Sequence, residues 1–253
     1  MKRSELDTYL NDILKPNLFS DYGPNGLQVE GSETISKIAF AVSATKHSIE
    51  EAIHKGADTL IVHHGLFWKF HGVRTITGSF AKRIKPLIEN QINLFGYHLP
   101  LDAQIEFGNA ASIAKTLELE NIEAFGDYKG SPTGVMGNFN TSIHVEDLRK
   151  KLQETLKHDI LVSKPALKDK ITSIGIITGG ANGGWIEASK KGLDAYLTGE
   201  MSEHDWNEAQ EEGIVMFAGG HHATERLGIQ ALMNKLQVEL NLETFFIDSP
   251  NPA

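Results

Sequence analysis

The sequence predicts an α/β fold of two interlocked, related domains with mostly parallel central strands. A strand–helix–strand pattern occurs twice, at residues 38–42, 47–55 and 58–62 and again at residues 174–177, 185–191 and 194–197. Each copy is short enough to form a right-handed unit whose two strands pair in parallel. No linker-like stretch separates the copies, so we expect residues 1–125 with 210–253 to form one domain and residues 126–209 the other.

A four-residue motif recurs at the same place in both copies. Lys55-Gly-Ala-Asp58 and Lys191-Gly-Leu-Asp194 each join the helix to the second strand, and a third strand follows at residues 92–95 and 214–218. The recurrence indicates an internal duplication. The alternative to a duplication is that strand–helix–strand units in general end their helix at a Gly and begin the next strand at an Asp, so the two copies look alike without being related.

The remaining elements follow from apolar spacing and from residues that end helices. Ser4 is a candidate N-cap, and Leu6, Leu10 and Leu14 follow at helical spacing until Pro16 ends the helix. Outside the two copies we also expect a turn-rich loop at residues 21–26, strands at 27–29 and 159–162, and helices at 80–90 and 145–157.

The composition excludes several classes of protein. The chain has 253 residues, with 24 Lys and Arg against 33 Asp and Glu, and a formal net charge of −9 with 11 His taken as neutral. This acidic balance argues against a dedicated duplex-DNA binder, which normally carries a basic face. The absence of Cys excludes disulfides and thiolate sites. No apolar run reaches the ~18–20 residues of a membrane span, and the N-terminal segment lacks a signal-peptide core, so we expect a cytoplasmic protein.

Histidines and carboxylates gather just after three of the predicted strands. They are His63, His64, His98, Asp102, His221, His222 and Glu225. Ligands of open α/β sheets bind at the carboxyl ends of the strands, and we expect these three ends to open on one edge of the sheet. Two neighbouring imidazoles can converge where a strand ends, and neutral imidazole binds Zn, Mn, Fe and Ni.

Each segment also has an ordinary structural interpretation. The histidine pair could lie in a polar turn, Asp102 could cap a helix, and Glu225 could stabilise a helix dipole. A helix that starts near His222, however, puts His221 and Glu225 one turn apart on one face. The combined set, with His98 and His222 in reserve, exceeds what one structural zinc needs and suits two ions ~3.5–4 Å apart. The five predicted metal ligands are His63, His64, Asp102, His221 and Glu225.

Weaker features lie close to these segments. The loop Gly179–Gly184 could hold a phosphate on its backbone N–H groups, but a flexible turn is the preferred interpretation. Glu200 takes the place of His64 in the second copy and could act as a general acid or base, or cap a helix. Four aromatic residues could line a pocket that stacks a base or pterin, or pack in the core, namely Phe19, Tyr22, Trp68 and Phe70.

Five short motifs occur in order along the whole chain. They are Pro24-Asn-Gly-Leu-Gln-Val-Glu-Gly31, His63-His-Gly-Leu-Phe-Trp68, Tyr97-His-Leu-Pro-Leu-Asp102, Thr198-Gly-Glu200 and Gly220-His-His-Ala-Thr-Glu225. Together they resemble the GTP cyclohydrolase I type 2 homolog family of dinuclear metal-binding proteins. The resemblance implies two divalent ions on the five predicted ligands, with Glu225 bridging. It also implies two α/β domains, the first closed by the C-terminal segment, and a toroidal homohexamer built as a trimer of dimers.

The ligand cluster and the resemblance together indicate a metal-dependent hydrolase of cyclohydrolase type. Such an enzyme would open the guanine imidazole ring of GTP with loss of formate, and Glu200 or His98 would move the protons. A phosphoester or amide hydrolase is the second hypothesis, and a non-catalytic ring that binds a protein or single-stranded nucleic acid is the third. No membrane partner is expected, and the mixed ligands suit Zn, Mn, Fe or Ni alike.

Overall fold

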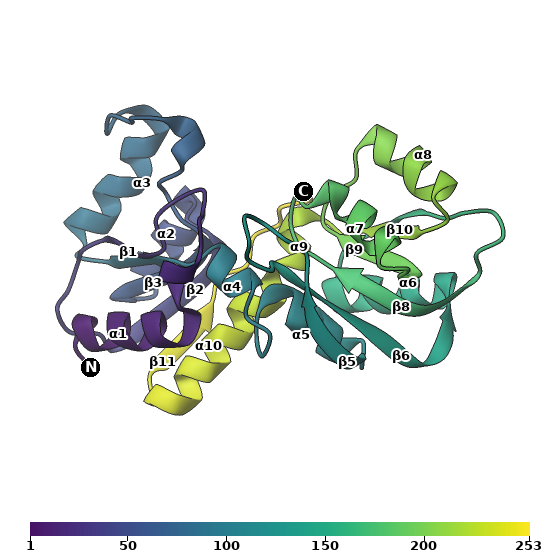
Figure 1. The fold of residues 1–253 in the computed structure, drawn as a ribbon. Helices are drawn as coiled ribbons and strands as arrows, with labels where there is room; N and C mark the ends of the chain where they lie inside the picture. The colour runs from purple at the N-terminus through teal and green to yellow at the C-terminus, as the bar shows by residue number, and fades with distance from the viewer. The chain divides into compact units, whose positions relative to one another are not determined.

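The structure, a computed structural model, describes residues 1–253 as two compact units (Figure 1). The first unit contains residues 1–101 and 229–250, and the second contains residues 102–228 and 251–253. Each unit has its own sheet with buried apolar clusters on it, so the predicted α/β class with mostly parallel central strands is confirmed. The chain crosses from one unit to the other three times, which makes the units interlocked in sequence.

Helices and strands alternate through most of the chain. The helices are α1 (Arg3–Leu14), α2 (Lys46–His54), α3 (Gly78–Glu89), α4 (Leu99–Asp102), α5 (Asn109–Thr116), α6 (Val145–Leu156), α7 (Trp185–Lys190), α8 (Glu203–Glu211), α9 (His221–Thr224) and α10 (Arg226–Leu240), with 3-10 turns η1 (Pro16–Leu18), η2 (Lys69–His71) and η3 (Asn182–Gly184). The strands are β1 (Gly26–Val29), β2 (Lys37–Ser43), β3 (Thr59–His64), β4 (Asn93–Gly96), β5 (Glu120–Phe125), β6 (Gly134–His144), β7 (Leu161–Ser163), β8 (Lys170–Ile176), β9 (Ala195–Thr198), β10 (Val215–Ala218) and β11 (Glu243–Phe246).

The sheet of the first unit has the strand order β1-β4-β3-β2-β11. All its strands are parallel except β1, which pairs antiparallel with β4. One apolar cluster joins Ile49 of α2 and Ile84 of α3 to Leu60 of β3, so these two helices cover one face of the sheet. The C-terminal strand β11 pairs with β2 and forms one edge of this sheet.

The sheet of the second unit has the strand order β5-β6-β8-β9-β10-β7. Its central strands β8, β9 and β10 are parallel, and the outer strands β5, β6 and β7 pair antiparallel with their neighbours. Ile113 of α5 and Leu152 of α6 pack in one cluster with Leu197, whereas Trp185 of α7 packs with Tyr196 in another. Because Tyr196 and Leu197 are neighbours in β9, the two clusters lie on opposite faces of the sheet.

The recurring motif builds the same connection in both units. Gly56 and Gly192 have φ angles of 71° and 72° after α2 and α7, a left-handed conformation that glycine adopts without strain. Asp58 and Asp194 each accept hydrogen bonds from two successive backbone N–H groups near the start of the preceding strand. The shared geometry supports the interpretation of two related halves.

Several details differ from the sequence prediction. Helix α1 begins at Arg3 rather than after a Ser4 cap, because the Glu5 carboxylate accepts the N–H of Lys2 and makes that residue the N-cap. Strand β3 continues through His64 and does not end at Val62. The β5–β6 hairpin and β11 were not predicted. None of the helices is long and apolar enough to cross a membrane.

The boundaries between the two units differ from the predicted boundaries at residues 125/126 and 209/210. Strand β5 pairs with β6, and α5 packs in the apolar cluster of the second sheet, so the chain enters the second unit at Asp102. Strand β10 pairs with β9 and β7 of that same sheet. The chain therefore returns to the first unit only at Ile229, inside α10.

Candidate metal centre

Three histidines of the first unit form one cluster at the carboxyl ends of two parallel strands. His63 and His64 are the last residues of β3, and His98 follows β4. The ring centroid of His63 lies 4.6 Å from that of His64 and 5.0 Å from that of His98. Donor nitrogens of all three rings lie within 4.8 Å of one another, so the set could hold a metal ion.

Each of these imidazoles has an oxygen partner at Nδ1. Nδ1 of His63 lies 3.0 Å from the carbonyl oxygen of Tyr97, and Nδ1 of His64 lies 3.0 Å from Oγ of Ser43. A carbonyl can only accept, so the His63 ring donates from Nδ1 and carries its lone pair on Nε2 when neutral. Outer hydrogen bonds of this kind fix the tautomer and the ring orientation of metal-binding histidines.

The Nδ1 partner of His98 is Asp21, at 2.7 Å from Oδ1. Asp21 is buried, and its carboxylate also accepts hydrogen bonds from the side-chain amide of Asn25 and from the backbone N–H of Leu99. Burial raises the pKa of Asp21, but the hydrogen bond and charge of His98, together with the hydrogen bonds from Asn25 and Leu99, outweigh it and hold this pKa below its usual range. The local sequence predicts only a turn-rich loop around Asp21, because its partner His98 is 77 residues away along the chain.

A small hollow in the first unit opens beside this cluster. His63, His98 and Trp68 line it. The Trp68 ring meets His98 edge-on, with centroids 5.1 Å apart and planes at 89°. Of the four aromatic residues proposed for a pocket, Trp68 lines the hollow, Phe70 stacks on Trp68, and Tyr22 lies edge-on to His98.

The second unit carries the other three predicted donors. Asp102 ends α4, His221 opens α9 and Glu225 follows α9 directly. His221 Nε2 lies 3.3 Å from Oε1 of Glu225, the one-turn separation that the sequence predicted. Carboxylate oxygens of Asp102 and Glu225 lie within 4.8 Å of each other. Glu225 thus lies near both His221 and Asp102, and we call these three residues the second donor set.

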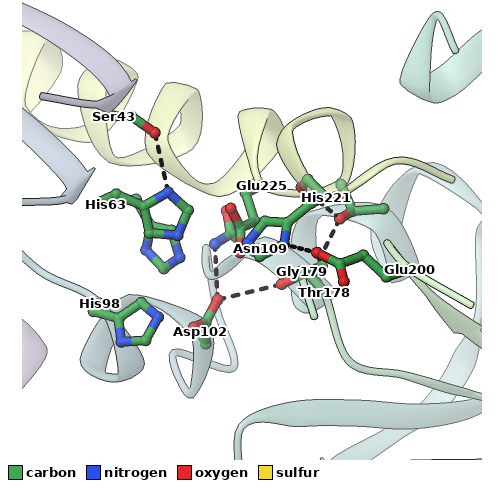
Figure 2. Close-up of polar contacts among 12 residues, drawn as sticks. Ser43, His63, His98, Asp102, Asn109, Thr178, Gly179, Glu200, His221 and Glu225 are labelled. Atoms are coloured by element: carbon green, nitrogen blue, oxygen red, sulfur yellow. Dashed lines mark hydrogen bonds and ion pairs between the residues drawn. The ribbon is translucent and has the colours of Figure 1, made fainter. Parts of the chain in front are cut away.

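Asp102 and His221 are oriented by neighbours of the same unit (Figure 2). The Asn109 amide and the Thr178 hydroxyl donate to Oδ1 of Asp102 at 2.8 and 3.2 Å. Nδ1 of His221 donates to Oε1 of Glu200 at 2.5 Å, which directs the lone pair of the neutral ring to Nε2. Glu200 therefore repeats at His221 the arrangement that Asp21 makes at His98.

The environment of His221 also changes its protonation. Burial alone would lower the pKa of His221, but hydrogen bonds and charge from Glu225 and Glu200 raise it to about 9. A metal ion held at Nε2 would have to displace this proton, so its binding would release a proton near neutral pH.

Gly179 gives the second donor set its space. An added Cβ would lie 2.4 Å from Oε1 of Glu225 and 3.2 Å from Nε2 of His221, and the φ angle of Gly179 is +70°. This glycine in the loop 179–184 thus permits close approach of the donor set. The phosphate-holding role of the loop stays a prediction.

The structure corrects the expectation of one common sheet edge. His63, His64 and His98 follow strands of the first sheet, whereas His221 follows β10 of the second sheet. The mixed nitrogen and oxygen donors of the two sets, without thiolate, remain suited to Zn, Mn, Fe or Ni.

His222, held in reserve as a ligand, is buried, and its backbone N–H donates to the carbonyl of Ala253.

The fold and the two donor sets define a two-unit α/β protein with candidate metal sites at the carboxyl ends of its strands. Comparison with known sequences assigns almost the whole chain to one family. The chain belongs to the Duf34/NIF3 family (NGG1p interacting factor 3), whose sequence profile matches residues 1–252.

Known relatives confirm the resemblance carried by the five motifs. The chain is 42% identical over 253 residues to the GTP cyclohydrolase 1 type 2 homolog of Pasteurella multocida, covering 100% of both chains. It is 39% identical over 250 residues to the protein of that name from Pyrococcus abyssi, covering 99% of both.

Solved structures share the whole fold. The structure described as protein ybgI, of unknown function, has a TM-score of 0.91 at 40% identity and covers 100% of both chains. TTHA1606 from Thermus thermophilus has a TM-score of 0.90 at 31% identity with the same coverage.

Proposed function

We propose that this protein is a dinuclear metal-dependent hydrolase of cyclohydrolase type. Two divalent ions would be held by His63, His64, Asp102, His221 and Glu225, with Glu225 shared between them as the family resemblance implies. The observation that carries the proposal is the orientation of the imidazoles: Nδ1 of His63 and of His221 each donates to an acceptor oxygen, which leaves Nε2 as the metal-binding atom.

The remaining chemistry is assigned to residues beside the donors. When bound, the ions supply Lewis acidity that makes water a nucleophile near neutral pH. Asn109 and Thr178 hold Asp102 in one orientation, so this carboxylate need not reorganise during the reaction. Glu200 and His98 are the two residues proposed to accept and return protons. Each lies within hydrogen-bond reach of a partner that fixes its position.

The proposed reaction is the opening of the guanine imidazole ring of GTP. One water adds at C8 and opens the ring to a formamide, and a second water releases C8 as formate and leaves a diamine. The printed names of the relatives support this substrate. A phosphoester or amide bond is the alternative substrate, because the same ions would activate water for either.

The test begins with elemental analysis of protein purified without chelator, for which about two metal ions per chain are expected. Protein loaded with Mn, Zn, Fe or Ni is then incubated with GTP, and formate and the diamine product are measured. The Asp102→Ala variant, which removes one donor, sets the background. Formate no higher than this background, with every metal, would reject the cyclohydrolase, and a panel of phosphoesters and amides would then test the alternative.

We also propose self-assembly into a homohexamer, a trimer of dimers, as the family resemblance implies. Light scattering should then give six times the 27.8 kDa mass of one chain. A non-catalytic ring that binds a protein or single-stranded nucleic acid is the other proposed role. Its nucleic-acid form requires salt-dependent binding to single-stranded DNA, and no binding at low salt would exclude it.

A further inference from the structure

We propose that the carboxyl edge of the first sheet carries a binding site for an anionic nucleotide, in which Arg74 and Arg83 bind the phosphates and Phe70 stacks on the base. This inference rests on the proposed function and deepens it, because it names residues that would hold the substrate. All three residues belong to the first unit, and none of them is a predicted metal ligand.

Positive charge is concentrated in residues 59–88, which form β3, most of α3 and the connection between them (Figure 1). This segment contains five Lys and Arg and no Asp or Glu, although the whole chain has a net charge of −9. Acidic side chains of neighbouring elements are already paired, Asp21 with His98 at 2.7 Å and Glu50 with Lys46 at 3.5 Å. A region of one sign raises the local concentration of ligands of the opposite sign, so this part of an acidic protein favours an anionic ligand.

Arg83 brings part of this charge to the edge that carries the histidines. Helix α3 follows the carboxyl end of β3, and Arg83 lies in its second turn. Its Nη1 donates to the carbonyl oxygen of Ala44 at 3.4 Å, and the N–H of Ala44 donates to the carbonyl oxygen of His64. This long hydrogen bond uses one of the five N–H donors of the guanidinium and leaves the others for a ligand.

Arg74 approaches the same helix from the connection that precedes it. Its guanidinium carbon lies 4.0 Å from the ring centroid of Phe80, which is one helical turn before Arg83. The cation–π contact holds the plane of the guanidinium, and Nη1 donates to Nδ1 of His71 at 3.0 Å. A planar guanidinium with N–H groups along its edges matches the spacing of phosphate oxygens, so two arginines beside one turn of α3 suit a phosphate chain.

Phe70 adds an aromatic surface to the same connection. This residue is 70% exposed, and its ring stacks on Trp68 with centroids 5.6 Å apart and planes at 18°. The indole N–H of Trp68 donates to the carbonyl oxygen of Gly65 at 3.1 Å, which fixes the ring beneath Phe70. Every base has a face that can stack on such a platform. An exposed aromatic ring beside cations therefore indicates a nucleotide rather than an inorganic anion alone.

The experiment measures binding of GTP, guanosine and inorganic tripolyphosphate to the metal-free full chain by calorimetry in the presence of chelator. GTP should bind, tripolyphosphate should compete with it, and both affinities should fall as ionic strength rises. Guanosine, which lacks phosphates, should bind at least tenfold more weakly than GTP.

Variants separate the two parts of the site. Arg74→Gln and Arg83→Gln each remove charged hydrogen-bond donors and should weaken both GTP and tripolyphosphate by about 10–100-fold. Phe70→Ser should weaken GTP by about 5–150-fold, the effect of losing one stacked base, and leave tripolyphosphate unchanged. A thermal unfolding curve for each variant shows that the fold is retained.

Lys55→Gln is the matched control, because it makes the same change of charge in the same unit. Lys55 follows α2 at the opposite ends of the strands, where its Nζ lies 3.8 Å from a carboxylate oxygen of Glu51. This variant should keep the wild-type affinity for GTP. A loss as large as that of Arg83→Gln would mean that binding follows net charge alone, and would overturn the site.

The outcomes distinguish this inference from the proposed function. Metal-free protein that binds neither GTP nor tripolyphosphate overturns the inference, whatever the formate assay gives. Binding of GTP that depends on Arg74, Arg83 and Phe70, without formate release by metal-loaded protein, supports the inference while the proposed reaction fails. A single-stranded oligonucleotide that binds through the same residues more tightly than GTP would assign the phosphates to nucleic acid and overturn the free nucleotide.

Discussion

Replacing Gly179 by alanine should remove the second donor set while leaving the fold intact. The added Cβ would lie 2.4 Å from Oε1 of Glu225 and 3.2 Å from Nε2 of His221. Real Cβ atoms do not tolerate the first of these distances, so the Glu225 carboxylate has to move. Such a movement separates it from His221, its neighbour at 3.3 Å.

The effect on stability can be estimated separately from the effect on the site. Gly179 has a φ angle of +70°, and an L-residue in the left-handed region costs roughly 1–2 kcal/mol. For a chain of this size, a loss of that magnitude lowers Tm by about 2–8 °C. The effect on metal binding should be larger, because a ligand displaced by even a fraction of an ångström no longer fits the coordination sphere.

Gly192 provides the matched control. Its φ angle is +72°, nearly the same as that of Gly179, but no heavy atom lies within 4 Å of its Cβ position. Gly192→Ala should therefore suffer the same backbone strain and keep its metal ions. Both variants are compared by thermal unfolding in chelator and by metal content after loading and desalting.

The expected result is a similar loss of Tm in the two variants and a loss of bound metal in Gly179→Ala alone. Metal content in Gly179→Ala equal to that of Gly192→Ala would refute the reasoning. It would mean that Glu225 is not a ligand, or that its side chain can rearrange without cost.

Four further outcomes are expected. Asn109→Ala leaves Asp102 with one fewer donor and should weaken metal binding by about 10–100-fold in chelator competition. Glu200→Gln removes a charge at Nδ1 of His221, so the raised pKa of that imidazole should fall in an NMR titration of metal-free protein, and an unchanged pKa would contradict the pairing. Asp194→Asn removes hydrogen bonds to a charged group and should cost about 1–2 kcal/mol in urea unfolding at neutral pH. Because contacts with Lys168, Thr172 and Ser173 lower the pKa of Asp194, this stabilisation is present above its ordinary pKa and is lost as the pH falls through the lowered value, so the two proteins should converge in acid. Removing metal with chelator should lower Tm, since ions at 100 times their Kd contribute about 2.7 kcal/mol per site, and an unchanged Tm would argue against a bound metal.

The sequence alone determined the features that depend on neighbours along the chain. The two strand–helix–strand copies and their Gly and Asp connections were predictable because apolar periodicity and backbone preferences act over a few residues. The pair His221 and Glu225 was predictable for the same reason, since one turn of helix relates them. The pattern also identified every histidine now found in the first-unit cluster.

Contacts between distant segments were decided only by the tertiary structure. Asp21 and His98 are 77 residues apart, and Thr178 and Asp102 are 76 residues apart, so no local pattern connects them. The predicted single sheet edge was wrong for a related reason: whether two strands share a sheet depends on pairing partners chosen by long-range packing. Local spacing thus identified the donor residues of this protein, whereas packing between distant segments selected the oxygen atoms that orient them.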